Sequence, residues 1–180
     1  VKPAIDVERI LGSLLRPDPA RAAALEAIVA SRGLLVPEWC WPGLALVASW
    51  LGGNAGVIVH SDADLDHAAA RIAFGGYYQA GQSCISVQRV LVASEVYEDF
   101  TARLVKQVES LKVGDPMDPT VDVGPVIAKG EVTRIKEWVE EAVSQGAEVL
   151  VGGTGEGSIF QPTLLSHVTP EMKVCREEVF

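Results

Sequence analysis

The tetrapeptide Gly81-Gln82-Ser83-Cys84 holds the residue types that point most directly to chemistry. It follows a helical pattern that begins at Ser61 and precedes a strand-like run from Ile85 to Ala93, which places the thiol in a turn. The thiolate is the reactive form of cysteine, and a helix terminus or cation that lowers the ordinary pKa of about 8.5 makes it a nucleophile. A lone cysteine is also a common small buried hydrophobe, so two interpretations of Cys84 stand open at this point.

Composition limits the classes of function. The chain has 180 residues, 48% of them hydrophobic, and a net charge of -9, which predicts a folded core and argues against nucleic acid as a partner. It has no basic cluster for a membrane surface and no apolar run near the ~20 residues of a bilayer span. Three widely spaced cysteines, Cys40, Cys84 and Cys175, predict a reducing, cytoplasmic location. The three histidines lack metal-ligand spacing, so no metal site is expected.

The first part of the chain differs in composition from the rest. Residues 1–49 favour helical or irregular structure, with an alanine-rich stretch over Ala20–Ser31, and three of the four tryptophans lie near the end of this part or directly after it (Trp39, Trp41 and Trp50). Those tryptophans fit either packing or a binding platform. The sequence therefore predicts two domains, a divergent and mostly helical segment over 1–49 and a second domain over 50–180.

A glycine-rich turn opens the second part. Leu51 to Gly56 precedes Val57 to Val59, which is expected to be a short buried strand. The dinucleotide pattern G-x-G-x-x-G and the P-loop are both absent, which favours a strand-linking turn over a phosphate site. Ser61 is expected to cap the following helix. The nearby Asp62, Asp64 and Asp66 are interpreted as helix-dipole partners, because the rest of a calcium loop is missing.

Strand and helix patterns alternate through the remaining chain. This order predicts an α/β fold with an open, largely parallel sheet and flanking helices. Glycines 75, 76 and 81 are expected to loosen the end of the helix before Cys84. The expected elements are a strand over Gln88–Ala93, helical stripes over Tyr97–Leu111 and Val132–Ala142, a loop over Val113–Pro125, a strand over Glu148–Val151 and an extended segment over Ile159–Leu165.

Seven short motifs follow one another in a specific order. They are Leu51-Gly52-Gly53-Asn54-Ala55, Asp62-Ala63-Asp64-Leu65, Gly81-Gln82-Ser83-Cys84, Gly114-Asp115-Pro116, Gly124-Pro125, Gln161-Pro162-Thr163 and Glu177-Glu178-Val179-Phe180. This series resembles the aldehyde dehydrogenase superfamily over Leu51 to Phe180. The resemblance implies that residues 50–180 are part of the catalytic domain of a two-domain α/β enzyme.

The resemblance also implies a mechanism. The cysteine matching Cys84 attacks an aldehyde carbonyl, and its own backbone N–H and an asparagine side chain hold the oxyanion. Hydride passes to NAD or NADP, and a glutamate base activates the water that hydrolyses the thioester. The residue matching Glu178 grips the ribose beside the nicotinamide, and the one matching Phe180 lies by the ring. Implied partners are a small aldehyde and, for the family, identical subunits.

Departures from the family pattern leave three functions open. The position of the general base holds Trp50, and the upstream asparagine, lysine and nucleotide-binding glycine turn have no match. Both ends are therefore expected to be cut, with a foreign or frame-shifted segment joined to an interrupted gene. The chain is an aldehyde-oxidising enzyme, an impaired remnant with a reactive thiol, or an interaction module. For the chain by itself, the missing base favours the impaired remnant.

Overall fold

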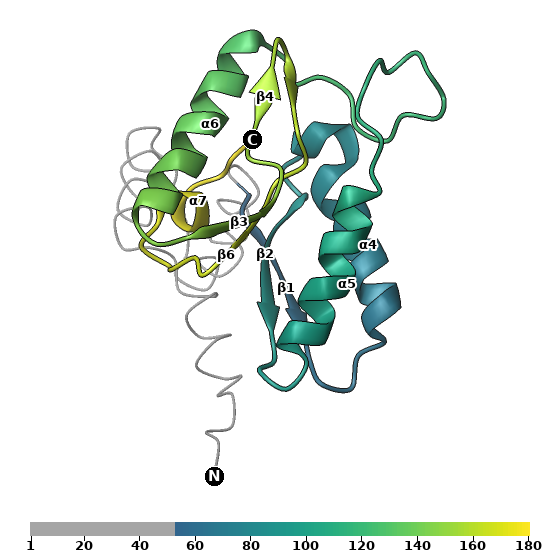
Figure 1. The fold of residues 1–180 in the computed structure, drawn as a ribbon, viewed down its shortest axis with the longest axis vertical. Helices are drawn as coiled ribbons and strands as arrows, with labels where there is room; N and C mark the ends of the chain where they lie inside the picture. The colour runs from purple at the N-terminus through teal and green to yellow at the C-terminus, as the bar shows by residue number, and fades with distance from the viewer. Residues whose placement is uncertain (1–52) are drawn as a thin grey trace, which may run out of the picture. The chain divides into compact units, whose positions relative to one another are not determined.

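The computed structural model describes residues 53–180 (Figure 1). The expectations for residues 1–49, the tryptophan cluster, Cys40 and Trp50 lie outside these described residues. Within residues 53–180, no helix has the length and apolar character needed to cross a bilayer. The elements, in chain order, are β1 Ala55–Val59, α4 Leu65–Tyr77, the 3₁₀ helix η2 Tyr78–Gly81, β2 Val87–Val92, α5 Tyr97–Glu109, α6 Lys129–Ser144, β3 Glu148–Val151, β4 Gly155–Glu156, β5 Ile159–Phe160, β6 Leu164–Ser166 and α7 Lys173–Arg176.

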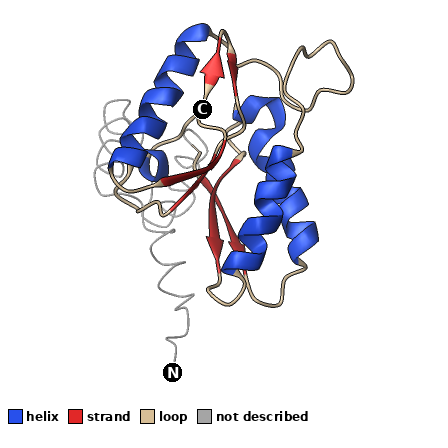
Figure 2. Cartoon of the chain, viewed as in Figure 1, coloured by secondary structure: helices blue, strands red, loops and turns tan. Residues whose placement is uncertain are grey.

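The strands of the described part pair in three two-stranded sheets (Figure 2). The helix α4 links β1 to β2, which run parallel as a crossover connection requires. The pairs β3–β6 and β4–β5 are antiparallel, so the α/β class is confirmed but only one pair of the expected parallel sheet is parallel. For β4–β5 the reason is local, because only Gly157-Ser158 joins these two strands and such a short connection permits only an antiparallel hairpin.

The helix α4 begins at a different cap from the expected one. The Oδ1 atom of Asp64 accepts a hydrogen bond from the backbone N–H of His67 at 3.0 Å, so Asp64, and not Ser61, is the N-cap. An aspartate directly before the first helical residue satisfies a free N–H and favours the positive end of the helix dipole. Asp64 caps the helix and Asp66 lies in its first turn, whereas Asp62 pairs with His60. Residues 53–180 contain no group of three or more His, Cys, Asp or Glu side chains that could hold a metal ion.

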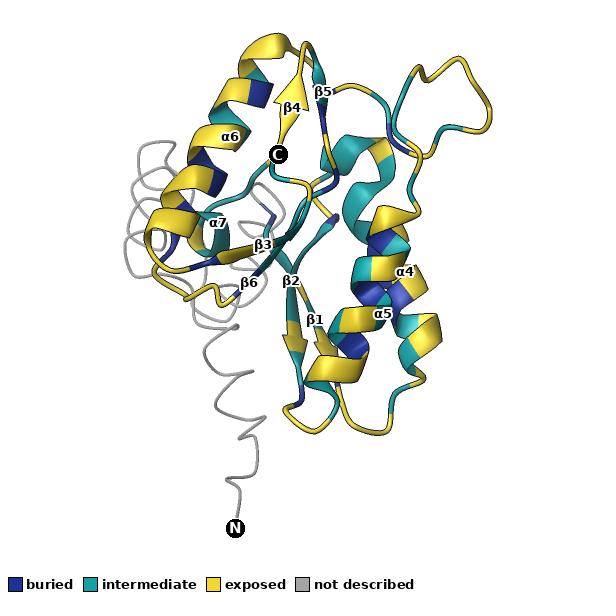
Figure 3. Ribbon diagram, in the orientation of Figure 1, coloured by how far each residue is buried: buried dark blue, intermediate teal, exposed yellow. Residues whose placement is uncertain are grey.

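The first hydrophobic core joins α4, α5 and the β1–β2 sheet, with both helices on one face (Figure 3). The stripe predicted for α5 is buried as expected, and Phe100 is only 1% exposed. Helical spacing of apolar residues places them on one face, which packs against the sheet. The buried members of this core are Val59, Ala69, Ile72, Ala73, Phe100, Leu104 and Val108.

The strand β1 is covered on one face only. Val59 is buried, whereas Ile58 is 47% exposed, so the expectation of a fully buried strand over Val57–Val59 is wrong for its middle residue. Side chains alternate between the two faces of a strand, and α4 and α5 pack only against the face that carries Val59. Ile58 lies beside Leu91 in the parallel register, and Leu91 is 37% exposed.

The helix α6 builds a second core with the later strands. Its predicted stripe buries Val132, Trp138, Val139 and Ala142. Phe160 of β5 packs into the same region, and Met172 lies against the end of the helix. Gly146 follows α6 with φ +106°, a left-handed conformation that suits glycine and ends the helix as expected.

Two glycines near the end of α4 allow close packing. The expectation that these two residues loosen the end of the helix is wrong. The helix continues through Gly75 and Gly76 to Tyr77. A Cβ at Gly75 would lie 3.1 Å from Cγ2 of Val87, and one at Gly76 would lie 3.2 Å from the carbonyl oxygen of Val87. These glycines therefore let α4 approach the start of β2, directly after the Cys84 turn.

Candidate active site

Cys84 lies in a turn between η2 and β2, and its side chain is exposed. This exposure excludes the interpretation of Cys84 as a small buried hydrophobe. The turn follows three consecutive residues with left-handed backbone angles, Gln79 at φ 52°, Ala80 at 56° and Gly81 at 75°. Such angles cost residues with a side chain on the order of 1–3 kcal/mol each, so the surrounding contacts must hold them. The reversal carries the chain from the end of α4 to the thiol.

Hydrogen bonds brace the turn from both sides of Cys84. The Tyr78 hydroxyl donates to Oγ of Ser83 at 2.5 Å, and Oγ of Ser86 donates to the carbonyl oxygen of Gly81 at 3.0 Å. Ser86 is only 1% exposed, so its hydroxyl acts as an internal strut. The residues before and after the thiol are therefore tied to η2, and an exposed sulfur sits on a backbone that its neighbours hold in place.

A further contact joins the turn to the loop before α6. The Oε1 atom of Gln82 accepts a hydrogen bond from the backbone N–H of Ile127 at 2.9 Å. These residues are 45 positions apart in the sequence. The bond therefore connects the cysteine turn to the second core and restrains its orientation.

The glycine turn at the start of the described chain packs directly against the cysteine turn. A Cβ on Gly53 would lie 1.9 Å from the carbonyl oxygen of Cys84, a distance that no side chain permits. Gly53 is therefore needed for the close approach of two backbones, whereas Ala55 and Gly56, which were expected in the turn, belong to β1. The position of the family's general base, Trp50, is three residues upstream in the sequence and outside the described residues.

We call the contact of Gly53 and Asn54 with the cysteine turn the junction. The side chain of Asn54 ties this junction to the last segment of the chain. Its Nδ2 atom donates to the carbonyl oxygens of Cys175 at 2.8 Å and Glu177 at 3.0 Å. Arg89 of β2 in turn donates from Nη2 to the carbonyl oxygen of Asn54 at 3.0 Å. The segment that carries Glu178 is thus fastened to the residue next to Gly53.

Glu178 and Phe180 differ in their surroundings. The Oε1 atom of Glu178 is buried and has no hydrogen-bond partner, whereas Phe180 is 50% exposed. The backbone N–H of Val179 donates to Oε1 of Gln88 at 3.2 Å, and Arg134 donates to the carbonyl oxygen of Phe180 at 2.6 Å. A free buried acceptor fits a hydroxyl donor such as that of a ribose, and a free aromatic face fits a planar ring.

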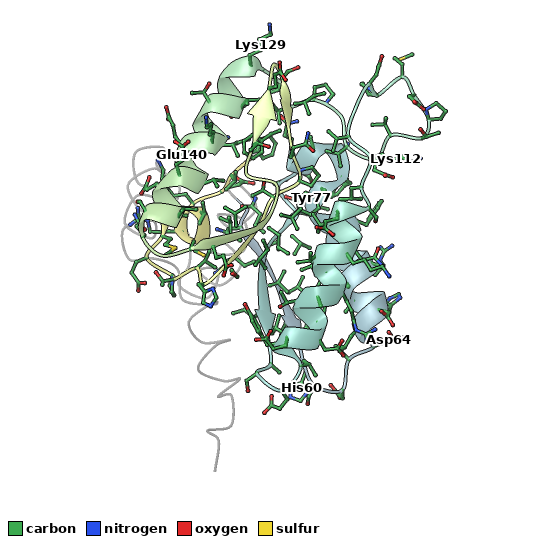
Figure 4. All side chains as sticks on the ribbon, in the orientation of Figure 1. His60, Asp64, Tyr77, Lys112, Lys129 and Glu140 are labelled. Carbon is green, nitrogen blue, oxygen red and sulfur yellow. The ribbon has the colours of Figure 1, made fainter. Side chains whose placement is uncertain are left out.

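A cavity of about 450 Å³ adjoins this segment. Its volume suits a small-molecule site, and its walls are mostly apolar with a few polar side chains, as is typical of such sites. Tyr77 lies at its wall, where its hydroxyl donates to the carbonyl oxygen of Thr163 at 2.7 Å (Figure 4). Burial raises the pKa of the Tyr77 hydroxyl, which keeps it a hydrogen-bond donor. The cavity also contacts Gln82, Gln88, Arg89, Cys175, Val179 and Phe180.

Cys175 is the second free thiol of the described chain, and it is partly buried. Burial raises the pKa of this thiol, Arg89 opposes the rise, and Glu171 adds to it. The contributing carboxylate is that of Glu171, and not one of the adjacent Glu177-Glu178 pair.

Sequence reasoning missed the residues that assemble the site. Asn54 lies within one of the family motifs, but the sequence indicates no role for its side chain. The sequence also indicates no role for Tyr78, Gln88 or Arg89. Two signals were available, namely an asparagine directly after paired glycines and two polar residues in the otherwise apolar strand β2. Neither signal identifies its partners, because the groups that Asn54 binds are more than 120 positions away.

Comparison with known proteins extends these observations. The model of the family described as "Aldehyde dehydrogenase family" matches residues 43–180 and so begins upstream of Leu51. The 3-sulfolactaldehyde dehydrogenase of Priestia aryabhattai is 47% identical over 138 residues, which cover 77% of this chain and 29% of that protein. A vanillin dehydrogenase of Pseudomonas fluorescens is 45% identical over 130 residues, with 72% and 27% covered.

Solved structures of this kind share the fold of the described residues. Aldehyde dehydrogenase 21 from Physcomitrella patens, in complex with succinate, has a TM-score of 0.68 at 37% identity and covers 71% of this chain and 27% of its own. The NADP-dependent glyceraldehyde-3-phosphate dehydrogenase of Bacillus halodurans, complexed with NADP, gives the same four values. The chain thus spans less than a third of the length of the curated relatives it matches.

Proposed function

Because the chain belongs to the aldehyde dehydrogenase family, we propose that it carries the nucleophile for the NAD(P)-dependent oxidation of an aldehyde to a carboxylic acid. The observation that carries the proposal is an exposed cysteine on a braced turn, next to a segment that ends in Glu178 and Phe180. A buried apolar cysteine offers no access to a carbonyl, whereas this thiol faces solvent on a backbone with few alternatives.

In the proposed chemistry the sulfur of Cys84 acts first as the nucleophile and later as the leaving group. Its thiolate adds to the carbonyl carbon of the aldehyde, and the carbonyl electrons move to oxygen to give a thiohemiacetal anion. The backbone N–H of Cys84 is a candidate donor to that oxyanion. Loss of hydride from the same carbon, which NAD(P) accepts when bound, leaves a thioester on Cys84. Water then releases the acid and restores the thiol.

Glu178 and Phe180 are the proposed cofactor-contacting residues. The unpaired buried Oε1 of Glu178 would accept a hydrogen bond from a ribose hydroxyl, and the exposed ring of Phe180 would lie by the nicotinamide. Both positions come from the family resemblance, and the orphaned acceptor supports them because a buried unpaired oxygen costs free energy until it has a donor. Either NAD or NADP suits these contacts.

Release of the acid is the step for which this chain lacks a group. Trp50 occupies the position of the family's general base and has no basic atom to activate water. Positioned acid–base groups typically supply about 10²–10⁴-fold in rate, so we expect the thioester on Cys84 to persist. We therefore propose an impaired form of the family reaction, in which acylation outpaces hydrolysis.

The proposed setting is a cytoplasmic enzyme acting on a small aldehyde, assembled from identical subunits, with no nucleic acid or membrane partner. The sequence around Cys84 is similar to family members that act on small hydroxy- or phospho-aldehydes. The names of two relatives, a 3-sulfolactaldehyde dehydrogenase and a glyceraldehyde-3-phosphate dehydrogenase, agree with a short anionic aldehyde, whereas a vanillin dehydrogenase of similar identity is named for an aromatic one, so the proposal extends only to a small aldehyde.

The experiment that tests this proposal follows cofactor reduction and the cysteine together. The purified chain is mixed with a small aldehyde and NAD or NADP, reduced nicotinamide is followed by absorbance, and the protein is analysed by mass spectrometry. We expect one burst of reduction and an acyl adduct on Cys84. The matched control is Cys84→Ser, which removes the adduct but leaves the other two cysteines, Cys40 and Cys175, in place.

Other outcomes would contradict the proposal in distinct ways. Sustained turnover by the wild-type chain would show that hydrolysis proceeds without a base at position 50. An adduct on Cys175 instead of Cys84 would remove the proposed nucleophile. We expect Trp50→Glu to fall short of full turnover, because the family's other cofactor contacts have no match here, and family-like rates in that variant would contradict this.

A second candidate function is an interaction module, and within residues 53–180 one observation bears on it, namely the exposed apolar side chains on one face of the β1–β2 sheet. Ile58 and Leu91 are partners in the register and are 47% and 37% exposed. Adjacent apolar residues on an uncovered sheet face are typical of an interface. Concentration-dependent association in sedimentation experiments, abolished by Ile58→Asp and accompanied by no reaction with aldehyde, would favour this function.

A further inference from the structure

We propose that Asn54 is a positioning residue that sets the place of Glu178 relative to Cys84. This inference rests on the proposed function, because the role of Glu178 as a cofactor contact comes from it. Asn54 itself does not touch the reacting atoms in this scheme. Its side chain holds the carbonyls of Cys175 and Glu177 by hydrogen bonds, and the preceding residue, Gly53, packs against Cys84.

Two hydrogen bonds restrain the backbone on either side of Glu178, and Asn54 makes one of them. Nδ2 of Asn54 holds the carbonyl oxygen of Glu177 at 3.0 Å, immediately before Glu178. Gln88 of β2 accepts the backbone N–H of Val179 at 3.2 Å, immediately after it. With its preceding carbonyl and its following N–H both held, the backbone at Glu178 has little freedom to turn.

The residue before Asn54 packs against the backbone of Cys84. Gly53, the preceding residue, lies so close to the carbonyl of Cys84 that a Cβ would come within 1.9 Å of the oxygen. Two consecutive residues thus link both groups, with Gly53 against the cysteine turn and Asn54 on the glutamate segment. A shift at Asn54 is therefore expected to change the separation of the two groups.

The chemistry of the amide determines which way the side chain points. Both partners, the carbonyls of Cys175 and Glu177, are acceptors, so the NH₂ group and not Oδ1 must face them. The opposite Oδ1 atom is buried without a partner, as are Nε of Arg89 and Oε1 of Glu178. Replacing Asn54 with aspartate would keep the shape and put a carboxylate oxygen against two carbonyl oxygens.

The first arm of the test measures the restraint itself. Amide hydrogen exchange is followed by mass spectrometry in the wild-type chain, in Asn54→Asp and in Asn54→Ala. Both variants lose the two hydrogen bonds to the carbonyls of Cys175 and Glu177, so we expect exchange over residues 173–180 to rise about tenfold or more, with α5 unchanged. Equal increases in α5 would indicate a general structural role and would overturn the proposal, as would unchanged exchange over 173–180.

A second variant keeps this arm decisive if the substitutions at Asn54 prevent folding. Gln88→Ala removes only the bond that holds the N–H of Val179 and leaves Asn54 in place. If Asn54 fastens the segment, the increase in exchange is confined to the amide of Val179 and its neighbour. An increase across the whole of 173–180 would show that Asn54 alone does not restrain it.

The second arm separates positioning from general structure through the cofactor. Titration with NAD or NADP is expected to give dissociation constants about tenfold higher for Asn54→Ala and for Glu178→Gln. If Asn54 acts through Glu178, the double variant binds no more weakly than the weaker single variant, whereas losses that add would contradict positioning. Absence of cofactor binding by the wild-type chain would contradict the proposed function, and the exchange measurement would still decide the restraint.

Discussion

The α4–α5 layer and the junction around Cys84 are held together in opposite ways. In the layer, apolar side chains pack almost completely, with Phe100, Leu104 and Val108 between 1% and 4% exposed. In the junction, Tyr78, Ser86 and Asn54 supply hydrogen bonds, and left-handed residues supply the path of the chain. The layer is held chiefly by the burial of apolar area, and the junction chiefly by directional hydrogen bonds, some of them buried, such as that of Ser86.

The difference teaches where stability and geometry each reside. Apolar burial is worth about 25 cal/mol per Å² and depends little on direction, so the layer stabilises the fold. A hydrogen bond contributes only about 0.5–1.5 kcal/mol net, but it depends on distance and angle. We therefore expect substitutions in the layer to unfold the chain, and those in the junction to move the thiol and Glu178 while the chain stays folded.

The largest effect should come from Phe100→Ala in the layer. Removing a side chain that is 1% exposed leaves a cavity, and we expect a loss of about 3–5 kcal/mol in the free energy of unfolding. Urea denaturation followed by circular dichroism measures it. The control is Met117→Ala at a residue 86% exposed, expected to change the value by about 0.5 kcal/mol or less. Equal losses in both variants would break the comparison.

Gly53→Ala tests the one position where the junction depends on close packing. The added Cβ would overlap the carbonyl of Cys84, so we expect a loss of about 2–3 kcal/mol and a changed rate of Cys84 alkylation. Gly56→Ala is the matched control, because no heavy atom lies within 4 Å of its Cβ position. A variant of Gly53 as stable as that of Gly56 would contradict the packing of the two turns.

Removal of the Tyr78–Ser83 hydrogen bond should have a smaller effect on stability and a visible one on the thiol. We expect Tyr78→Phe and Ser83→Ala each to cost about 1 kcal/mol, and the double variant to cost less than their sum. The rate of Cys84 alkylation by iodoacetamide should change in both single variants. Strict additivity would show that this bond does not brace the turn.

The smallest effect concerns pH. Burial raises the pKa of Cys175 in the folded chain, so its protonated thiol is favoured by folding. This contribution is fully present below the unfolded pKa of about 8.5, and it is lost as pH rises through the higher folded pKa. We expect the free energy of unfolding to fall more steeply above that pH in the wild-type chain than in Cys175→Ala. Parallel pH curves would contradict it.

Much of the architecture followed from the sequence because its signals are local. The stripe containing Phe100, Leu104 and Val108 predicted α5, and Glu148–Val151 was predicted with the bounds that β3 has. Periodic burial is written along a single element, so one segment suffices to predict it. The ordered motifs around Cys84 likewise identified the family, which the match over residues 43–180 shows.

Tertiary structure alone decided how the candidate site is assembled. Every residue carries a backbone carbonyl, so nothing in the sequence distinguishes those of Cys175 and Glu177 as partners of Asn54. The direction of strand pairing and the approach of Gly53 to Cys84 are of the same kind. The sequence determined which residues are apolar, which lack a side chain and which carry a thiol or a carboxylate. Contact between distant segments decided which of them meet, because hydrogen bonds and close packing depend on position in space.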